Sequence, residues 1–308
     1  MMRLVIVILI FVGNVLAAYG QSVQELLDRY LQRVRQNPTE QVPNVLLRED
    51  LAAELLAAAP AFYTDTIAAV RGKVYFIISK LGQGSSTSAT REKAVSLLTA
   101  AITDSNAGNA GAVLNSLSFF PKQDFTAAAK DTIAKRIDQK IYHYDMLLKL
   151  AGYLVLESKA EIIRSYAFYN NSNTRDRWAA LLALSRMGDT EATQSILARV
   201  QRLKLNDDVV YEVFPDLVYT RQPAAIEYMV TVLNSDEKNC LSPNPDSEVP
   251  IVCGYRVMEQ LAPIIDGYPL KLGPSGDIEA TDYVKALEQV RKWFKTKGTN
   301  YTIRKDTF

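Results

Sequence analysis

The stretch DRWAALLALSRMGDTEA, residues 176–192, contains an apolar helical pattern that stops at a glycine and an aspartate and then starts again. Gly188 can adopt the left-handed backbone that ends a helix, because it has no side chain to clash. Asp189 can accept the free amide hydrogens at the start of the next helix. The stretch therefore predicts two helices joined by a tight turn, which together form a helical hairpin.

Both helices of this hairpin carry an apolar face. In the second helix, Ala192, Ile196 and Val200 recur at spacings of four, which is the period of an amphipathic helix and not of a strand. In the first helix, small residues around Ala179 and Ala183 would let a neighbouring helix approach closely. Each hairpin therefore has two apolar faces to cover.

The same break recurs along the chain. An apolar helix halts at a short polar turn after each of five residues, namely Leu81, Phe120, Leu156, Met187 and Thr220. Successive breaks are 39, 36, 31 and 33 residues apart. A single hairpin cannot bury both of its apolar faces, but stacked hairpins form a continuous core. The sequence therefore predicts an all-α fold, an α-solenoid of about six hairpins with irregular caps at its ends.

Four segments follow from this pattern. We expect a signal peptide over 1–20, an N-terminal helical cap over 21–60, repeats over 61–236 and a capping hairpin with a long insertion over 237–308. Within the caps, helices are predicted over 22–36, 46–59, 250–266 and 280–297. End units lack a neighbour on one side, so irregular terminal hairpins are typical of repeat proteins.

The first residues have the order of a secretory signal. Arg3 gives a positive start, residues 4–12 are continuously apolar, and small residues precede a cleavage position between Ala17 and Gln21. A membrane anchor is the alternative, but the apolar run falls short of the roughly 20 residues that span a bilayer. We therefore expect a secreted or periplasmic protein without an integral membrane segment after cleavage.

Cys240 and Cys253 are the only two cysteines. An exported protein meets an oxidising compartment, which favours joining them in a disulfide. A metal or redox pair is the weaker alternative, because the CxxC spacing is absent and the only histidine, His143, is distant in the sequence. The polar insertion around the cysteines also offers oxygen donors for calcium. Asn244, Asp246 and Glu248 alternate in it, and Asp236 and Glu237 lie nearby in the sequence.

The central hairpin resembles a known repeat. The matching residues are Asp176, Arg177, Ala179, Ala180, Leu184, Met187, Gly188, Asp189, Glu191 and Ala192, and they are similar to the HEAT-like repeat first associated with phycobilisome lyases. Looser matches occur at 91–94 and around Arg71, so the resemblance covers about residues 60–236. The layout also resembles secreted HEAT-repeat proteins of bacteria related to Bacteroides. The resemblance implies a solenoid that holds partner proteins, and it implies no particular reaction.

Several chemical functions are disfavoured by the sequence. The chain lacks the GxSxG motif of serine hydrolases and the glycine-rich loops of nucleotide-binding proteins. One histidine cannot supply the paired His-Glu dipeptides of di-iron HEAT-repeat hydroxylases. The formal net charge is +1, so no overall field favours nucleic acid. We therefore expect a protein that is not an enzyme, has no cofactor and does not bind nucleic acid.

Binding is the remaining class of function. The second helices of successive hairpins line the inner face of a solenoid, and their exposed positions would form a basic row with some aromatic character. The row comprises Lys130, Lys135, Arg164, Arg199, Arg202 and Tyr228. Arg and Tyr dominate interface energetics, although such rows are also common on solvated faces. The expected partner is another protein, and it should be acidic if the basic row forms the interface. The alternative ligand is a glycan or envelope polymer. A divergent enzyme is the least favoured function.

Overall fold

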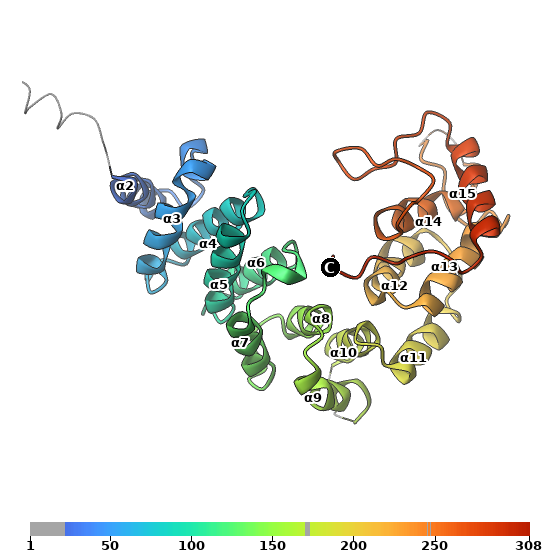
Figure 1. Cartoon of the computed structure of the whole chain (residues 1–308), viewed down its shortest axis with the longest axis horizontal. Helices are drawn as coiled ribbons and strands as arrows, with labels where there is room; N and C mark the ends of the chain where they lie inside the picture. Colours follow the sequence, from blue (N-terminus) through green and yellow to red (C-terminus); the bar gives the residue numbers. More distant parts are fainter. Residues whose placement is uncertain (1–21, 170–172, 245, 247) are drawn as a thin grey trace, which may run out of the picture. The chain divides into compact units, whose positions relative to one another are not determined.

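The computed structural model describes residues 22–169, 173–244, 246 and 248–308, and its regular structure is helical (Figure 1). Across these residues the β contacts are three isolated bridges. The predicted all-α class is therefore confirmed. No helix in the described part of the chain combines the length and apolar composition needed to cross a lipid bilayer. The predicted signal peptide, 1–20, lies outside the described residues.

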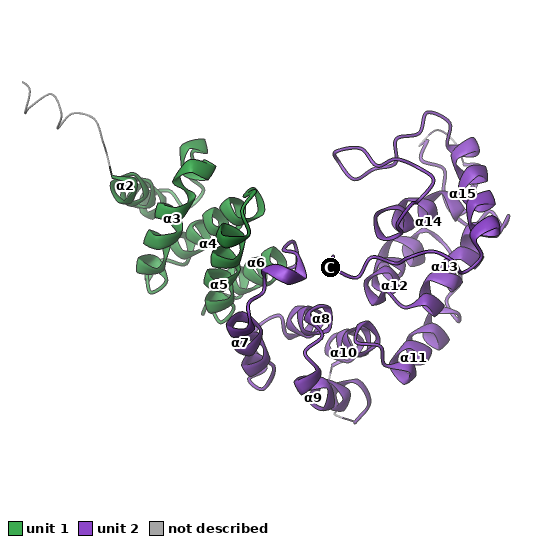
Figure 2. Cartoon of the chain, in the orientation of Figure 1, with its two compact units in different colours: residues 1–117 green, residues 118–308 purple. Residues whose placement is uncertain are grey.

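The chain forms two compact units (Figure 2). Unit 1 comprises residues 1–117 and unit 2 comprises residues 118–308. The boundary falls inside the segment 61–236 that was predicted to form one run of repeats. Each unit has its own buried core, so each is described separately.

Unit 1 contains helices that pack in equivalent pairs. Its α-helices are α2 (Val23–Gln36), α3 (Ala52–Ala58), α4 (Ala68–Gln83), α5 (Ser88–Ala101) and α6 (Ala107–Leu117). The first helix of each hairpin contacts the first helix of the next, so α2 packs on α4 and α4 on α6. The second helices do the same, because α3 packs on α5.

Unit 2 repeats this arrangement. Its α-helices are α7 (Ala127–Ile137), α8 (Tyr144–Leu154), α9 (Ala160–Arg164), α10 (Thr174–Arg186), α11 (Thr190–Val200), α12 (Phe214–Thr220), α13 (Pro223–Asn234), α14 (Gly254–Leu261) and α15 (Tyr283–Lys297). Helices α8, α10, α12 and α14 contact one another in that order, and α11, α13 and α15 form a second such series.

The hairpin predicted from residues 176–192 is present as α10 and α11. Gly188 has a φ of 101°, which is the left-handed backbone expected at the end of a helix. The Asp189 carboxylate accepts a hydrogen bond of 2.8 Å from the amide of Ala192. Both details of the predicted turn are therefore confirmed.

The small residues of α10 do allow a close approach. A Cβ placed on Gly152 of α8 would lie 2.5 Å from the Cα of Ala183 and 2.6 Å from the hydroxyl of Tyr219. Real Cβ atoms do not come this close to backbone. Glycine is therefore required on α8 for the backbones of α8 and α10 to meet at Ala183.

Hydrogen bonds between successive hairpins recur at one sequence separation. Four side chains bond to a group 33 residues away, in the pairs Arg71 with Asp104, Gln83 with Ser116, Tyr153 with Phe120 and Arg186 with Tyr219. The same separation divides the last two breaks predicted from the sequence, at Met187 and Thr220. The structural separation therefore equals one of the four sequence intervals, which lies in unit 2.

Two of the predicted cap helices are shorter than expected. The segment 46–59 is broken, because Arg48 has an extended backbone and only Ala52–Ala58 is α-helical. The segment 250–266 begins its helix at Gly254, because Ile251 is paired with Cys240 in a β-bridge. The helices predicted over 22–36 and 280–297 are present as α2 and α15.

The predicted disulfide is present, with an S–S distance of 2.07 Å between Cys240 and Cys253. We expect its reduction to lower the free energy of unfolding by roughly 3 kcal/mol, because opening a loop of about 14 residues restores entropy to the unfolded chain. Urea denaturation with and without dithiothreitol measures the loss. The double variant Cys240→Ser, Cys253→Ser should show the same loss and no response to dithiothreitol. An unchanged midpoint after reduction would contradict this expectation.

Candidate functional site

The most unusual cluster of unit 2 consists of cationic and aromatic side chains from neighbouring hairpins. Arg186 ends α10, Arg221 follows α12, and Tyr153 and Tyr219 lie on α8 and α12, with Lys122 beside Tyr153. We call these five residues the arginine chamber. Arg186 and Arg221 are only 7% and 2% exposed, and arginine is seldom buried so completely without a partner.

Arg186 lies between two aromatic rings. Its guanidinium carbon is 5.6 Å from the ring centre of Tyr153 and 5.4 Å from that of Tyr219. Such cation–π contacts strengthen when water is excluded. The guanidinium also donates hydrogen bonds to the main-chain oxygens of Tyr219, Lys305 and Thr307, the last at 2.6 Å.

Arg221 takes a left-handed backbone, with a φ of 53°, where α12 ends. Few residues other than glycine adopt this conformation. The side chain donates 2.9 Å and 3.0 Å hydrogen bonds to the main-chain oxygens of Arg304 and Phe308, and it also bonds to Val218 and to the hydroxyl of Thr307.

Residues 304–308, which we call the C-terminal tail, therefore lie in the chamber. The tail follows α15 and runs back to α12 and α10 (Figure 1). The hydroxyl of Tyr153 lies 2.6 Å from the main-chain oxygen of Asp306. The ring of Phe308 packs 5.5 Å from Tyr153 and 5.1 Å from Tyr219. The chamber thus holds an extended segment by its backbone and by one aromatic side chain.

The chamber concentrates positive charge. Burial, together with the nearby charge of Arg186, lowers the pKa of Arg221 to about 10. Burial also lowers the pKa of Lys122, and Arg186 again adds to the shift. The hydrogen-bond acceptors around the two arginines are main-chain oxygens and one hydroxyl, and the negative charge of Asp306 raises the pKa of both arginines. The site is therefore suited to bind carbonyl or carboxylate oxygens.

An apolar cavity of about 560 Å³ opens beside the tail. It is lined by Ser118, Phe119, Phe120, Pro121, Gln123, Asp306, Thr307 and Phe308. Phe119 is 66% exposed, which is unusual for a large apolar side chain. The tail therefore leaves adjoining apolar surface uncovered.

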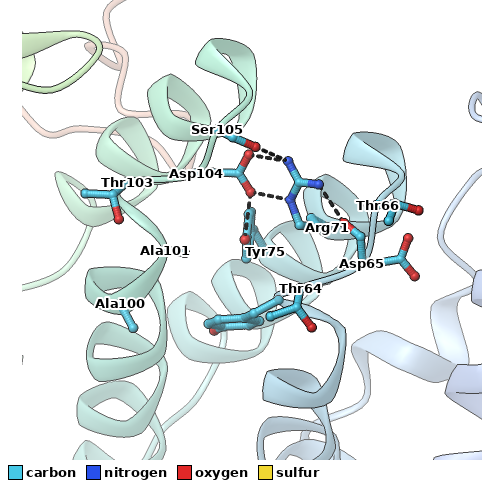
Figure 3. A pocket seen from close by; sticks show the side chains of 11 residues that line it. Thr64, Asp65, Thr66, Arg71, Tyr75, Ala100, Ala101, Thr103, Asp104 and Ser105 are labelled. Atoms are coloured by element: carbon cyan, nitrogen blue, oxygen red, sulfur yellow. Dashed lines mark hydrogen bonds and ion pairs between the residues drawn. The ribbon is translucent and has the colours of Figure 1, made fainter.

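A second cavity, of about 500 Å³, lies in unit 1 and is polar (Figure 3). Arg71 extends from α4 to Asp104, and two nitrogens bond to the two carboxylate oxygens at 2.6 Å and 2.7 Å. The hydroxyl of Tyr75 donates to the same carboxylate at 2.8 Å. Arg71 and Asp104 thus satisfy each other, and they tie α4 to the turn before α6.

We expect the Asp104 interaction to weaken in acid. Burial alone would raise the pKa of Asp104, but hydrogen bonds from Arg71, the Asn106 amide and Tyr75 outweigh it and lower the pKa to about 2. A carboxylate with a lowered pKa stabilises the fold at any pH above its pKa in the unfolded chain, which is near 3.8. This contribution is lost as the pH falls towards 2. The expected loss is about 2 kcal/mol.

Urea denaturation between pH 5 and pH 2 measures this loss. Other carboxylates titrate in the same range, so the comparison is with Asp104→Asn, which has no charge to lose at this position. The free energy of unfolding of the wild type should fall by about 2 kcal/mol more than that of the variant. Parallel pH profiles would contradict the assignment of the lowered pKa to Asp104.

The predicted basic row is partly engaged in internal contacts. Arg164 forms ion pairs with Asp189 and Glu191, and Arg199 lies 5.0 Å from the ring centre of Trp178. Tyr228 is half-buried and packs against Phe214. Of the other three residues, Lys135 and Arg202 are exposed and Lys130 is half-buried. The six residues lie on α7, α9, α11 and α13 and on the turn after α11.

No group of three or more His, Cys, Asp or Glu side chains gathers as a metal site within the described residues. In the loop offered above as a calcium site, Asp236 pairs with Arg291 and Glu237 accepts a hydrogen bond from Asn239. The chamber residues were not among the predicted site residues. Comparisons with family models, with curated proteins and with solved structures gave no match to this chain.

Proposed function

We propose that this protein is a noncatalytic scaffold that binds a partner protein and is built as an α-solenoid of HEAT-like hairpins. The observation that carries the proposal is the series of equivalent helices within each unit, with α8, α10, α12 and α14 in contact in that order. In a solenoid each repeat packs on its neighbours alone, which leaves long surfaces free for partners. The bonds at a separation of 33 residues support the same arrangement.

Export is part of the proposal. The order of residues 1–20 favours a cleaved secretory signal, and the disulfide suits an oxidising compartment. N-terminal sequencing of the protein recovered from the envelope or the medium tests this part. We expect a mature chain that begins between residues 18 and 21. An intact N-terminus on protein retained in the cytoplasm would contradict export.

The partner is tested by crosslinking a tagged chain in its native cells and isolating it under denaturing conditions. We expect one protein to be recovered in stoichiometric amount. Small-angle scattering of the purified chain tests the solenoid, because a solenoid gives a larger radius of gyration than a compact domain of about 290 residues, for which R_g is about 19 Å. A compact particle that crosslinks to no protein would contradict the proposal.

Binding of an anionic glycan is the second candidate. The contact of Arg199 with Trp178 favours it. The guanidinium could bind an anionic group of the sugar, and the neighbouring aromatic ring could pack against the apolar face of the sugar. Arg202 lies exposed one turn further along. Retention on a glycan array that is lost in the double variant Arg199→Ala, Arg202→Ala would favour this candidate over a protein partner.

A further inference from the structure

The polar cavity of unit 1 is lined by many hydroxyl groups (Figure 3). Six of its eleven lining residues carry one, namely Tyr63, Thr64, Thr66, Tyr75, Thr103 and Ser105. We call this cavity the hydroxyl pocket. Its volume of about 500 Å³ lies within the range of small-molecule sites. A hydroxyl both donates and accepts hydrogen bonds, so the lining is suited to a ligand whose groups do the same.

Part of this hydrogen-bonding capacity is free. The hydroxyl of Tyr63 is engaged, because it donates a 3.0 Å bond to the main-chain oxygen of Leu97. The hydroxyl of Ser105 accepts a 3.1 Å bond from Arg71 and keeps its own hydrogen to donate. The three lining threonines are exposed, and their hydroxyls form no hydrogen bond with the described part of the chain. Four of the six hydroxyls can therefore bond to a ligand.

The charges around the hydroxyl pocket cancel. Asp104 is paired with Arg71, and Asp65 is paired with Arg35. Burial raises the pKa of the two lining tyrosines, so both phenols stay neutral. An anionic or a cationic ligand would find no unpaired counter-charge here to offset the loss of its hydration. The pocket therefore favours a neutral ligand.

Arg71 holds both walls of the hydroxyl pocket. Its guanidinium donates a 2.7 Å hydrogen bond to the main-chain oxygen of Asp65 in one wall, and bonds of 2.6 Å and 2.7 Å to Asp104 in the other (Figure 3). The ring of Tyr63 packs edge-on against Tyr75, with 5.3 Å between ring centres. These contacts are internal to the protein, so binding a ligand would order the walls little further.

We propose that the hydroxyl pocket binds a neutral carbohydrate, whose hydroxyls exchange hydrogen bonds with the lining threonines and Ser105. Sugars carry several groups that donate and accept at once, which matches this lining. A free amino acid would need unpaired charges, and a nucleobase would need an open ring to stack on, whereas Tyr75 is 5% exposed. The inference goes beyond the protein-binding function proposed above. It also concerns another unit, and a ligand of different charge, from the anionic glycan considered at Arg199.

The test applies the tagged full chain to an array of oligosaccharides. The neutral probes are oligomers of glucose, mannose, galactose, xylose and N-acetylglucosamine, and the anionic probes are oligogalacturonate and heparin. We expect binding to at least one neutral oligosaccharide. Its affinity, measured by isothermal titration calorimetry, should change little between low and high salt, because the ligand has no charge to screen. Binding to none of the neutral oligosaccharides would overturn the proposal.

Filling the hydroxyl pocket should abolish this binding. Ala100 lines the pocket from an exposed position of α5, so Ala100→Phe places a ring in the space a sugar would occupy. We expect the affinity for the neutral oligosaccharide that binds most tightly to fall by about tenfold or more. The matched control is Ala89→Phe, at an exposed position of α5 outside the lining, which should bind as the wild type does. An Ala100→Phe variant that binds as well as the control contradicts the assignment to this pocket.

A second variant keeps the test decisive if Ala100→Phe does not fold. The double variant Thr64→Val, Thr103→Val keeps the shape of both side chains and removes two free hydroxyls. We expect it to bind the same oligosaccharide about tenfold more weakly, because two hydrogen bonds are lost. Circular dichroism should show an unchanged fold. An affinity equal to that of the wild type would rule out the proposed hydrogen bonds.

The site in unit 1 is separated from the other proposals by one further variant. Arg199→Ala, Arg202→Ala should bind the neutral oligosaccharide as the wild type does. Loss of binding in this variant, with binding retained in Ala100→Phe, would overturn the proposal and place the carbohydrate site in unit 2. Recovery of a protein by crosslinking bears on the scaffold function alone, so the two proposals can fail independently.

Discussion

Replacing Gly152 with valine is expected to lower the free energy of unfolding by about 4 kcal/mol or more, which is near the upper end for single substitutions. Even the first carbon of the new side chain would lie 2.5 Å from the Cα of Ala183. That atom belongs to the backbone of α10, so no rotation of a side chain can relieve the clash. Helices α8 and α10 would have to separate.

The loss should exceed the gain in helix propensity. Glycine inside a helix costs about 1 kcal/mol relative to alanine, so propensity alone favours the substitution. The matched control is Gly108→Val at an exposed position of α6, where a Cβ meets only the side chain of Asn106, at 3.1 Å. Urea denaturation should show little change for the control. Equal stability of Gly152→Val and the wild type would contradict the close packing of α8 on α10.

The same substitution is expected to affect the arginine chamber. Tyr219, whose hydroxyl would lie 2.6 Å from the new Cβ, donates a hydrogen bond to the main-chain oxygen of Lys149 and packs against Phe308. Separation of α8 from α10 would therefore move one wall of the chamber. Packing between hairpins and the geometry of the arginine chamber thus depend on the same contact.

Much of the fold was predictable because its determinants are local. The turn at Gly188 and Asp189 needs only a residue that tolerates positive φ and a carboxylate that can cap a helix, and both are visible in the sequence. The apolar period of α10 and α11 is equally local. The disulfide could be predicted because only Cys240 and Cys253 were available.

The cap helices were harder to place because tertiary contacts set their ends. The helix predicted over 46–59 lacks its first turns in the structure, where Arg48 is extended and the carboxylate of Glu49 accepts hydrogen bonds from the amide and hydroxyl of Ser86. Helical propensity in this segment is high, but it does not reveal such a pairing. Likewise, the pairing of Ile251 with Cys240 delays the start of α14. Propensity is therefore overridden where a contact across the loop competes with it.

The arginine chamber could not be predicted, because its parts are far apart in sequence. Arg186 and Arg221 bond to tail residues 121 and 87 positions away. In the sequence each is a basic residue beside a turn, which is typical of a solvated surface. The only local signal is Arg221 itself, since it occupies the position after α12 where glycine is common. Residues of the predicted row, by contrast, were chosen for apparent exposure, and Arg164 is instead paired with Asp189.

Removing the carboxylate of Asp104 is expected to cost 3–5 kcal/mol, the range roughly found when one partner of a buried ion pair is deleted. In Asp104→Ala the guanidinium of Arg71, whose side chain is 8% exposed, loses its bidentate acceptor. The amide of Asn106 and the hydroxyl of Tyr75 lose theirs as well. The control is Asp50→Ala, which removes a pair with Arg48 that is 58% exposed on both sides and should leave the denaturation midpoint unchanged.

Replacing both partners separates the cost of an unpaired charge from the value of the pair. The double variant Arg71→Met, Asp104→Leu fills the space with apolar groups and leaves no buried charge, so it should recover most of the stability lost in Asp104→Ala. Urea denaturation of the two single variants and the double variant gives the coupling energy. A double variant as unstable as Asp104→Ala would instead show that the ion pair itself stabilises the junction between α4 and the turn before α6. The pair would then stabilise the fold as well as determine how α4 packs against this turn.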